Sequence, residues 1–266
     1  MIRILVDNSS DILETNKHKN LEIIQIPLTY KEKTITGIAL NEFYALLENT
    51  DILPKTSQIS PEIYMDYFLK YKNDEIICIC LSSKLSGTFS SANLAKQLLS
   101  DDYDTTNIHL IDSESATIQF ALLVKLALKD LDAGKSCKEI IENLEKNKKE
   151  ITLRAIVDDL EFLYKGGRLS RASAIIGGTL NIKPVLEIKD GEIKVVTKAR
   201  GLKKANRSIL EELNEKNPKE IIVGYATKWE SYDAFKEQID RPFEELQIGS
   251  IIGTHLGPKC YAIAYL

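Results

Sequence analysis

The most constraining feature of this chain is an apolar strand that passes into a helix through a short polar turn. Residues 76–81 are apolar over the length of a strand, and the turn 85–89 reads Leu-Ser-Gly-Thr-Phe. Small and apolar residues within 92–99 then recur at the three- and four-residue spacing of one helix face. The first backbone N–H groups of a helix are unpaired, and together with nearby hydroxyls they can hold an anion. The turn therefore predicts a ligand with a negatively charged group.

Short strands alternate with helices throughout the first half of the chain. The patterns predict strands at residues 2–6, 21–27, 76–81 and 108–111, and helices at 42–48, 62–71, from 88, at 116–133 and at 136–147. This alternation predicts a parallel, layered α/β sheet.

The second half of the chain has a different character. The patterns predict helices at 159–164, from 202 and at 231–239, and strands at 152–157, 182–188, 193–199, 221–225 and 261–266, with two short strands or one bent strand at 246–252. Asp190-Gly191 lies between two of these strands and predicts a hairpin turn. The charged stretch 145–150 separates the halves, so we expect two domains, residues 1–150 and 151–266.

Composition argues against two classes of partner. The formal net charge of −4 lacks the basic excess of a nucleic-acid-binding surface. No apolar run approaches the roughly 20 residues of a membrane span. The N-terminus enters a strand without a signal peptide, so a cytoplasmic location is expected.

The cysteines and two of the three histidines carry no predicted function. Cys78 and Cys80 point to the same face of one strand and are interpreted as reduced core residues. The other two cysteines are isolated in sequence, which favours a reducing compartment. We predict no metal site, and no role for His18 or His109.

Three polar clusters follow strands or breaks, at residues 7–11, at 55–58 and around Ser86. Because α/β sheets bind ligands at the carboxyl ends of their parallel strands, the first and third clusters are expected to be neighbours. Thr56 and Ser57 could join them from a connecting loop. Hydroxyl groups orient a carboxylate or a phosphate without adding fixed charge. Helix caps and turns are the alternative use of such residues.

His255 and two arginines are the remaining candidates. His255 lies in the glycine-flanked segment 253–258, interpreted as a turn where the backbone can approach a ligand closely. Arg168 and Arg200 each adjoin a glycine, and a guanidinium there could face an anion. A structural or exposed histidine and solvated surface arginines are the alternatives.

Seven short segments resemble, in the same order, those of the DegV family of bacterial fatty-acid-binding proteins. They are Asp-Asn-Ser-Ser-Asp at 7–11, Pro-Lys-Thr-Ser-Gln at 54–58, Leu-Ser-Ser-Lys-Leu-Ser-Gly-Thr at 81–88, Lys-Gly-Gly-Arg at 165–168, Asn-Ile-Lys-Pro at 181–184, Lys-Ala-Arg-Gly at 198–201 and Gly-Thr-His-Leu-Gly-Pro at 253–258. Each segment is weak alone, whereas seven in register are specific. The chain departs from the family pattern at Asn8, where serine is usual, and at Lys259, where glycine is common.

The resemblance implies a two-domain DegV-like fold, with an N-terminal parallel-sheet, Rossmann-like domain and a C-terminal α/β domain with a mixed sheet. One long-chain fatty acid would lie between the domains, and no other cofactor is implied. Family members that serve a fatty-acid kinase present the carboxylate to a separate ATP-dependent protein, which makes acyl-phosphate for phospholipid synthesis. The resemblance therefore implies a kinase partner and no complete active site in this chain.

The same resemblance assigns site residues. The Thr56 and Ser86 hydroxyls and the Gly87 amide would bind the carboxylate, with His255 near the same head group. Further contacts with the head group or the partner would come from Ser57, Arg168 and Arg200.

Two enzyme alternatives remain open. A serine acyl hydrolase would use Ser86 as nucleophile and His255 as base, but the Gly-x-Ser-x-Gly elbow lacks its first glycine here. A phosphotransferase would use His255 covalently, but the sequence has no Walker-type motif. If a fatty acid binds, apolar side chains must line its tunnel, and our candidates are Phe89, Ile118, Phe120 and Ile175.

Overall fold

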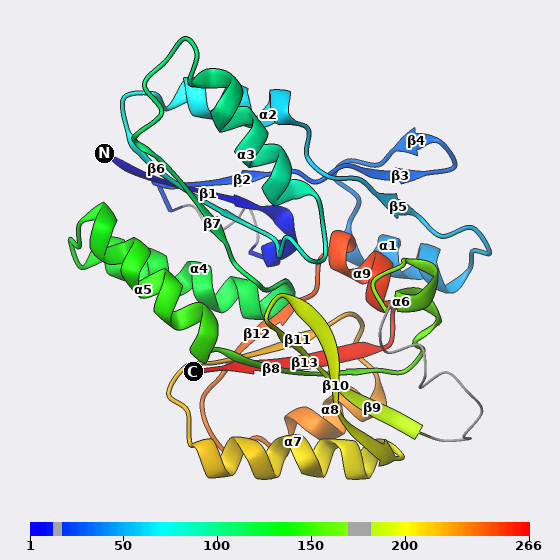
Figure 1. The fold of residues 1–266 in the computed structure, drawn as a ribbon. Helices are drawn as coiled ribbons and strands as arrows, with labels where there is room; N and C mark the ends of the chain where they lie inside the picture. The colour runs from blue at the N-terminus through cyan, green and yellow to red at the C-terminus, as the bar shows by residue number, and fades with distance from the viewer. Residues whose placement is uncertain (13–17, 170–181) are drawn as a thin grey trace.

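The chain folds around two main β-sheets, with helices between them and outside them (Figure 1). The computed structural model describes residues 1–12, 18–169 and 182–266. Within these ranges no helix is both long and apolar enough to cross a membrane.

The first sheet has four parallel strands in the order β2-β1-β6-β7. The strands are β1 (Ile2–Asp7), β2 (Leu21–Ile24), β6 (Glu75–Cys80) and β7 (Ile108–Asp112). After its first residue β6 is buried throughout, because helices cover both faces of the sheet. Parallel strands bring all their carboxyl ends to one edge of the sheet, and this edge faces the site described below.

The second sheet is mixed, with the order β10-β9-β8-β13-β11-β12, and only β11 and β12 pair in parallel. Its strands are β8 (Thr152–Val157), β9 (Ile182–Lys189), β10 (Glu192–Arg200), β11 (Ile221–Tyr225), β12 (Glu244–Gln247) and β13 (Cys260–Tyr265). Along β8, Leu153 and Ala155 belong to the core between the sheets, and Ile156 belongs to the core on the other face. The predicted α/β fold class, with one parallel and one mixed sheet, is confirmed.

A helical layer lies between the two sheets (Figure 1). In this layer α4 (Thr117–Asp132) packs against β8, β11 and β13, and α5 (Cys137–Glu150) packs against α4 and β6. The capping box that the sequence predicts at the start of α5, between Ser136 and Glu139, is present. Because α4 comes from the first half of the chain and packs on the second sheet, the domain boundary at residue 150 stays a prediction.

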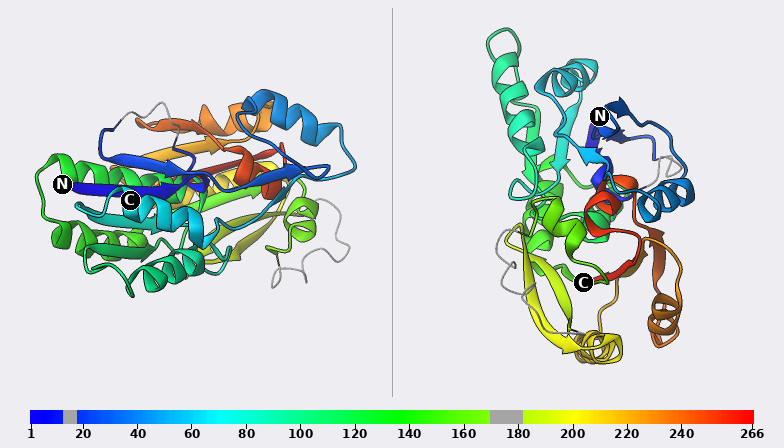
Figure 2. Two further views of the ribbon diagram at one scale, coloured as in Figure 1. Left: turned by 90° about the horizontal axis from the view of Figure 1, so that it is seen from above. Right: turned by 90° about the vertical axis from the view of Figure 1, so that its right-hand side faces the viewer.

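Further helices cover the outer faces of the two sheets, as Figure 1 and Figure 2 show. They are α2 (Pro61–Lys70) and α3 (Thr88–Leu99) beside the first sheet, and α7 (Leu202–Lys216) and α8 (Glu230–Lys236) beside the second. The predicted hairpin between β9 and β10 is confirmed. Asp190 and Gly191 have φ of +53° and +78°, as a two-residue hairpin of the type I′ class requires.

The sequence patterns do not predict a small antiparallel sheet that the structure contains. Its strands are β3 (Leu28–Tyr30), β4 (Lys33–Thr34) and β5 (Lys55–Thr56), and α1 (Leu40–Glu48) lies between the last two in the chain. Strands of two or three residues are too short to show a period of two in the sequence. This sheet carries Thr56, which pairs with Leu28.

The strand prediction for residues 246–252 is wrong beyond Gln247. Residues from 250 onward form the helix α9 (Ser250–Leu256), and the short helix α6 (Glu161–Lys165) packs against it. A short apolar run fits a buried helix as well as a strand, so the sequence pattern could not separate the two. His255 therefore lies in the last turn of a helix and not in an irregular turn.

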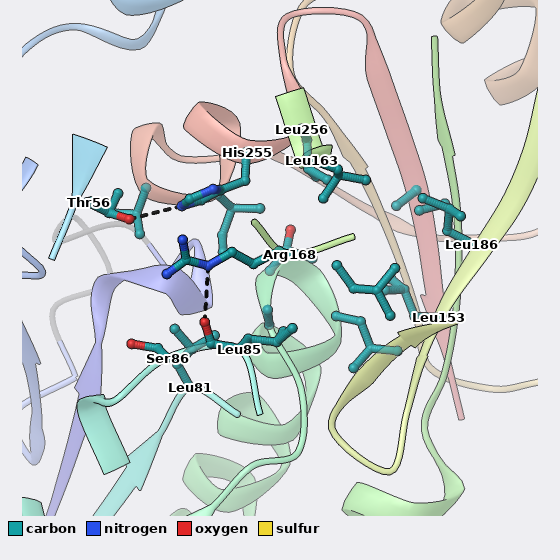
Figure 3. Close-up of a pocket in the computed structure, with 18 of the residues that line it drawn as sticks. Thr56, Leu81, Leu85, Ser86, Leu153, Leu163, Arg168, Leu186, His255 and Leu256 are labelled. Carbon is teal, nitrogen blue, oxygen red and sulfur yellow. Dashed lines mark hydrogen bonds between the residues drawn. The ribbon is translucent and has the colours of Figure 1, made fainter. Parts of the chain in front are cut away.

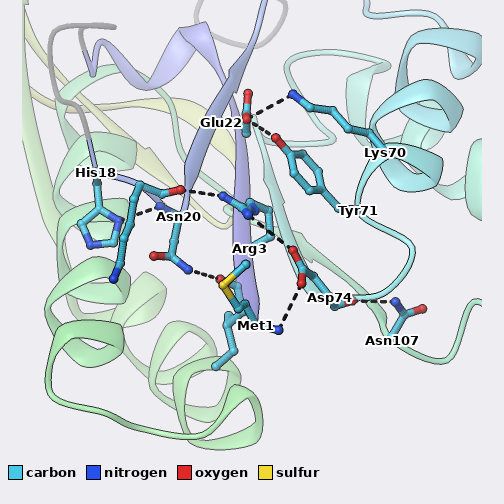
Figure 4. A network of polar contacts seen from close by, with 11 residues as sticks. Met1, Arg3, His18, Asn20, Glu22, Lys70, Tyr71, Asp74 and Asn107 are labelled. Carbon is cyan, nitrogen blue, oxygen red and sulfur yellow. Dashed lines mark hydrogen bonds and ion pairs between the residues drawn. The ribbon is translucent and has the colours of Figure 1, made fainter.

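A network of ion pairs and hydrogen bonds lies at the amino end of the first sheet (Figure 4). The Met1 amino group is 3.1 Å from the Asp74 carboxylate, and the Arg3 guanidinium is 3.4 Å from the same group. Arg3 also donates to the Lys19 carbonyl at 2.6 Å. These contacts tie the start of β1 to the loops before β2 and β6.

Candidate functional site

A cavity lies between the two main sheets, and residues from both halves of the chain line it (Figure 3). Its volume is about 90 Å³, several times the ~10–15 Å³ that one water molecule needs. Thr56, Ser86, Arg168 and His255 gather at one end, where Ser57 and Gln58 follow Thr56 in the chain. Thr117 and Glu187 also line the cavity. Most of the remaining lining is aliphatic and includes Leu81, Leu85, Leu153, Ala155, Leu163, Leu186, Ile188, Ile193, Leu256 and Ala262. The cavity therefore has a polar end and a mostly apolar interior.

Thr56 and His255, which are 199 residues apart in the chain, meet at the polar end. The Thr56 Oγ1 atom is 2.9 Å from His255 Nε2 (Figure 3). Thr56 is held at the end of β5, and His255 is held by the last turn of α9. The neighbouring Ser57 and Gln58 are exposed, so the polar end opens to solvent.

The His255 ring fits closely against Gly166. A Cβ atom on residue 166 would lie 2.4 Å from His255 Nδ1, so any larger residue there would displace the ring. Burial and the nearby Arg168 guanidinium lower the pKa of His255 to about 4, so the imidazole is neutral at pH 7. Its Nδ1 atom has no hydrogen-bond partner among the described residues.

The state of Nδ1 favours one tautomer of His255. A buried N–H without an acceptor is rarer in proteins than a buried lone pair without a donor. A proton on Nε2 and none on Nδ1 is therefore the better arrangement. In this tautomer Nε2 donates to Thr56 Oγ1, and the Thr56 hydroxyl keeps its own proton free for another acceptor.

Ser86 lies in the turn before α3. Its Oγ atom accepts a hydrogen bond from the Thr88 backbone N–H at 3.2 Å and lies 3.0 Å from Thr88 Oγ1. Gly87 is the N-cap residue of α3, and a Cβ atom there would collide with the Gln58 side chain. The clusters at 55–58 and around Ser86 therefore pack against each other. Gly87 itself is not among the residues that line the cavity.

Arg168 brings a positive charge to the polar end. Its Nε atom donates to the Leu85 carbonyl at 3.3 Å, so the side chain reaches from the loop after α6 to the turn that carries Ser86 (Figure 3). Arg200, in contrast, is exposed at the end of β10 and does not line the cavity.

A family model described as an uncharacterised protein of the DegV family matches residues 1–266. The chain belongs to the DegV family. A DegV domain-containing protein of Caldanaerobacter subterraneus is 35% identical, over 99% of this chain and 98% of that protein.

Two solved structures of DegV-fold proteins illustrate the likeness. DegV from Bacillus subtilis, named as a fatty acid binding protein, is 30% identical with a TM-score of 0.87, over 99% of this chain and 98% of that one. The Fatty Acid Kinase (Fak) B3 protein of Streptococcus pneumoniae, loaded with linoleic acid, is 24% identical with a TM-score of 0.84, over 100% and 99%.

The first polar cluster, residues 7–11, stabilises the fold and does not line the cavity. Asp7 is buried and accepts hydrogen bonds from the backbone N–H groups of Ser9 at 3.1 Å and Leu81 at 2.7 Å. Asp11 accepts from Thr117 Oγ1 at 2.5 Å and from the Gly249 N–H at 2.9 Å. Burial raises the pKa of Asp7 to about 6 and that of Asp11 to about 7. The cluster adjoins the strand before Ser86, as expected, but none of its side chains lines the cavity.

Three of the four predicted tunnel residues do not line the cavity. Ile118 and Phe120 are fully buried in the core, and Phe89 is half-buried outside the cavity lining. Ile175 lies outside the described residues, as does Asn181 of one family segment. Sequence reasoning placed Gln58 in a polar cluster without assigning it a contact, and it missed the aliphatic wall built by β8, β9 and β13. The alternation of Leu153 and Ala155 along β8 was a usable signal for that wall.

Proposed function

We propose that this protein binds one long-chain fatty acid in the cavity and presents its carboxylate to a separate kinase. The observation that carries the proposal is the contact of Thr56 with His255 at the polar end of a cavity whose lining is otherwise mostly aliphatic. A fatty acid has the same two parts, a charged head and an apolar chain.

The Thr56 and Ser86 hydroxyls at the polar end can donate hydrogen bonds to a carboxylate. The Ser86 oxygen already accepts from the Thr88 N–H, and the Thr56 oxygen accepts from His255 Nε2 in the favoured tautomer. The Thr56 proton is then free for a carboxylate, and the Ser86 proton is free when Thr88 Oγ1 is the donor in its 3.0 Å contact with Ser86 Oγ. Burying an ionised carboxylate is unfavourable unless donors meet it, and the Arg168 charge adds to their effect.

The apolar interior accounts for the tail. Each buried CH₂ contributes about 0.8 kcal/mol, so a chain of about sixteen carbons gains on the order of 12 kcal/mol before the cost of ordering it. Fatty acid binding is stated for DegV of Bacillus subtilis, and its sequence likeness to this chain supports the same ligand class here.

The role as a kinase subunit is the finer part of the proposal. It draws on the kinase-serving members of the family that the sequence motifs resemble, and on the position of the polar end. The pneumococcal protein, at 24% identity, supports the fold alone. Because Ser57 and Gln58 are exposed there, a partner could reach the carboxylate from solvent. The partner would supply ATP and the phosphoryl group.

The geometry disfavours the acyl hydrolase alternative. A serine nucleophile needs a hydrogen bond to its base, and the base needs a third group to orient it. Here His255 Nε2 contacts Thr56 and not Ser86, and within the described chain nothing bonds to His255 Nδ1.

The decisive test combines ligand identification with a matched pair of variants. Native mass spectrometry of untagged protein, followed by lipid extraction, should yield one intact fatty acid per chain. Ser86→Ala removes one donor to a buried charge and should weaken fatty acid binding by roughly 1.5–3 kcal/mol. Ser83→Ala, an exposed serine in the same loop, should leave the affinity unchanged. Equal affinities of wild type and Ser86→Ala would refute the assigned role.

The kinase role is tested separately. With labelled ATP and a fatty acid, the purified chain alone should form no acyl-phosphate, and a cognate kinase should form it only when the chain is added. Product formation by the chain alone, or hydrolysis of an acyl ester that Ser86→Ala abolishes, would replace the carrier proposal with an enzyme.

A further inference from the structure

A second cluster of chemistry-bearing side chains lies at the amino end of the first sheet, away from the cavity. Glu75 begins β6, His109 lies on the adjacent strand β7, and Cys137 is the first residue of α5. One carboxylate oxygen, one imidazole nitrogen and the thiol sulfur of these residues all lie within 4.8 Å of one another. The three side chains come from separate parts of the chain and converge only in the folded protein.

We propose that Glu75, His109 and Cys137 bind one Zn²⁺ ion. Carboxylate, imidazole and thiolate are the three ligand types that proteins use for zinc, and three protein ligands plus one water complete a tetrahedral site. The mixed sulfur and nitrogen donors disfavour Mg²⁺ and Ca²⁺, which prefer oxygen ligands.

The distances fit this coordination after small side-chain movements. Two oxygen or nitrogen ligands at about 2.0–2.1 Å from a tetrahedral zinc lie about 3.3 Å apart, and a sulfur ligand lies about 3.6 Å from either. His109 Nε2 and Glu75 Oε2 are already 3.0 Å apart. The thiol sulfur is within 4.8 Å of one carboxylate oxygen of Glu75 and one imidazole nitrogen of His109, so rotation of partly exposed side chains can bring it into range.

The backbone holds two of the three ligands firmly. Glu75 and His109 lie on hydrogen-bonded parallel strands, where Ile76 pairs with Ile108 and Ile77 with His109. The capping box of α5 fixes the helix start immediately before Cys137. A zinc ion here would therefore join β6, the edge strand β7 and α5, and would release the thiol proton to solvent on binding.

A redox role for the thiol fits less well. Burial and the Glu75 carboxylate raise the pKa of Cys137 to about 11, which keeps the thiol protonated at neutral pH and weakly nucleophilic. All four cysteines are free, and the other three are buried. A metal can displace the thiol proton without any oxidant.

The test uses the untagged full chain, stripped of metal with a chelator and kept reduced. Zn²⁺ is titrated in competition with a chromophoric chelator, and Co²⁺ is used as a spectroscopic probe. We expect one Zn²⁺ per chain and, with Co²⁺, the thiolate charge-transfer band and visible bands of a four-coordinate site. Zn²⁺ should also slow maleimide labelling of Cys137.

Variants separate this site from adventitious binding. Cys137→Ser and His109→Ala should each lower Zn²⁺ affinity by more than the ~10–100-fold typical of losing an outer-shell partner. His18→Ala is the matched control, because His18 Nε2 pairs with Asp132 at 3.0 Å without a thiol, and it should bind Zn²⁺ as wild type does. Circular dichroism and the metal-free melting temperature report that each variant is folded. The proposal would be overturned if the folded Cys137→Ser and His109→Ala proteins bound Zn²⁺ like wild type. It would also be overturned if wild type with Co²⁺ lacked the charge-transfer band.

Discussion

The two ends of the first sheet use the same kinds of polar residue in opposite ways. At the carboxyl end, Asp7 and Asp11 are buried and accept hydrogen bonds from backbone and hydroxyl donors. At the amino end, half-buried Asp74 forms ion pairs with the exposed Met1 amino group and with half-buried Arg3 (Figure 4).

This difference explains where a binding site can form. Exposed ion pairs are screened by water and salt and contribute little each. Hydrogen bonds between buried groups are strong, and a buried group that loses its partner lowers the free energy of unfolding substantially. The carboxyl end can therefore hold hydroxyls and a neutral histidine in fixed positions beside an apolar cavity. Four predictions test this comparison.

The largest expected effect concerns Asp11. Its folded pKa of about 7 exceeds the usual value of about 3.9, so the folded protein holds the proton more tightly than the unfolded chain does. The stability contributed by neutral Asp11 is complete below about pH 4 and is lost as the pH rises to about 7. Asp11→Asn should therefore stabilise the protein at pH 8 by on the order of 3 kcal/mol and little at pH 4.

Urea unfolding of Asp11→Asn and wild type across this pH range measures the difference. Asparagine tolerates the positive φ of residue 11 and can keep both hydrogen bonds, to Gly249 and Thr117, so the fold should be retained. A difference in stability that does not change with pH would contradict the prediction.

The second effect is the loss of Asp7. Asp7→Ala leaves the buried N–H groups of Ser9 and Leu81 and the Ser9 hydroxyl without their acceptor. We expect the free energy of unfolding to fall by about 3 kcal/mol. Chemical denaturation at pH 7 measures it, and a loss as small as that at Asp74 would remove the contrast between the two ends.

The third effect is on binding. Thr56→Val keeps the shape of the side chain and removes its hydroxyl, so fatty acid affinity should fall by about 2 kcal/mol, or roughly 30-fold. Thr29→Val, in the same small sheet but outside the cavity lining, is the control and should bind normally. Equal fatty acid affinities of Thr56→Val and Thr29→Val would show that Thr56 does not bind the carboxylate.

The smallest effect is expected at the amino end. Asp74→Ala removes both ion pairs of that carboxylate but should cost less than about 1 kcal/mol. The loss should shrink further at high salt, because the Met1 amino group is exposed. A salt-independent loss as large as that of Asp7→Ala would make the two ends alike.

Much of the fold is predictable from sequence because its elements have strong local signals. The apolar run before Ser86, the capping box of α5 and the Asp190-Gly191 hairpin were all predicted and are confirmed. The small sheet around Thr56 escaped prediction because its strands are too short to show a period. The helix α9 escaped because its apolar residues fit two structures.

The site is less predictable because it depends on contacts between distant segments. Thr56, Ser86 and His255 were singled out with the help of family motifs, and the structure brings all three to one cavity. Its aliphatic wall comes from the second sheet, whose position relative to the first no local pattern encodes. The cluster of Glu75, His109 and Cys137 was missed for the same reason, since each residue alone carries no signal.

The place of β13 has a consequence for when the cavity can exist. This strand follows every other strand in the chain, yet it lies in the middle of the second sheet, between β8 and β11. Until the ribosome has released residues 260–265, β8 and β11 have no common neighbour and the wall that includes Ala262 is missing. The proposed cargo must therefore be taken up after β13 has closed the sheet.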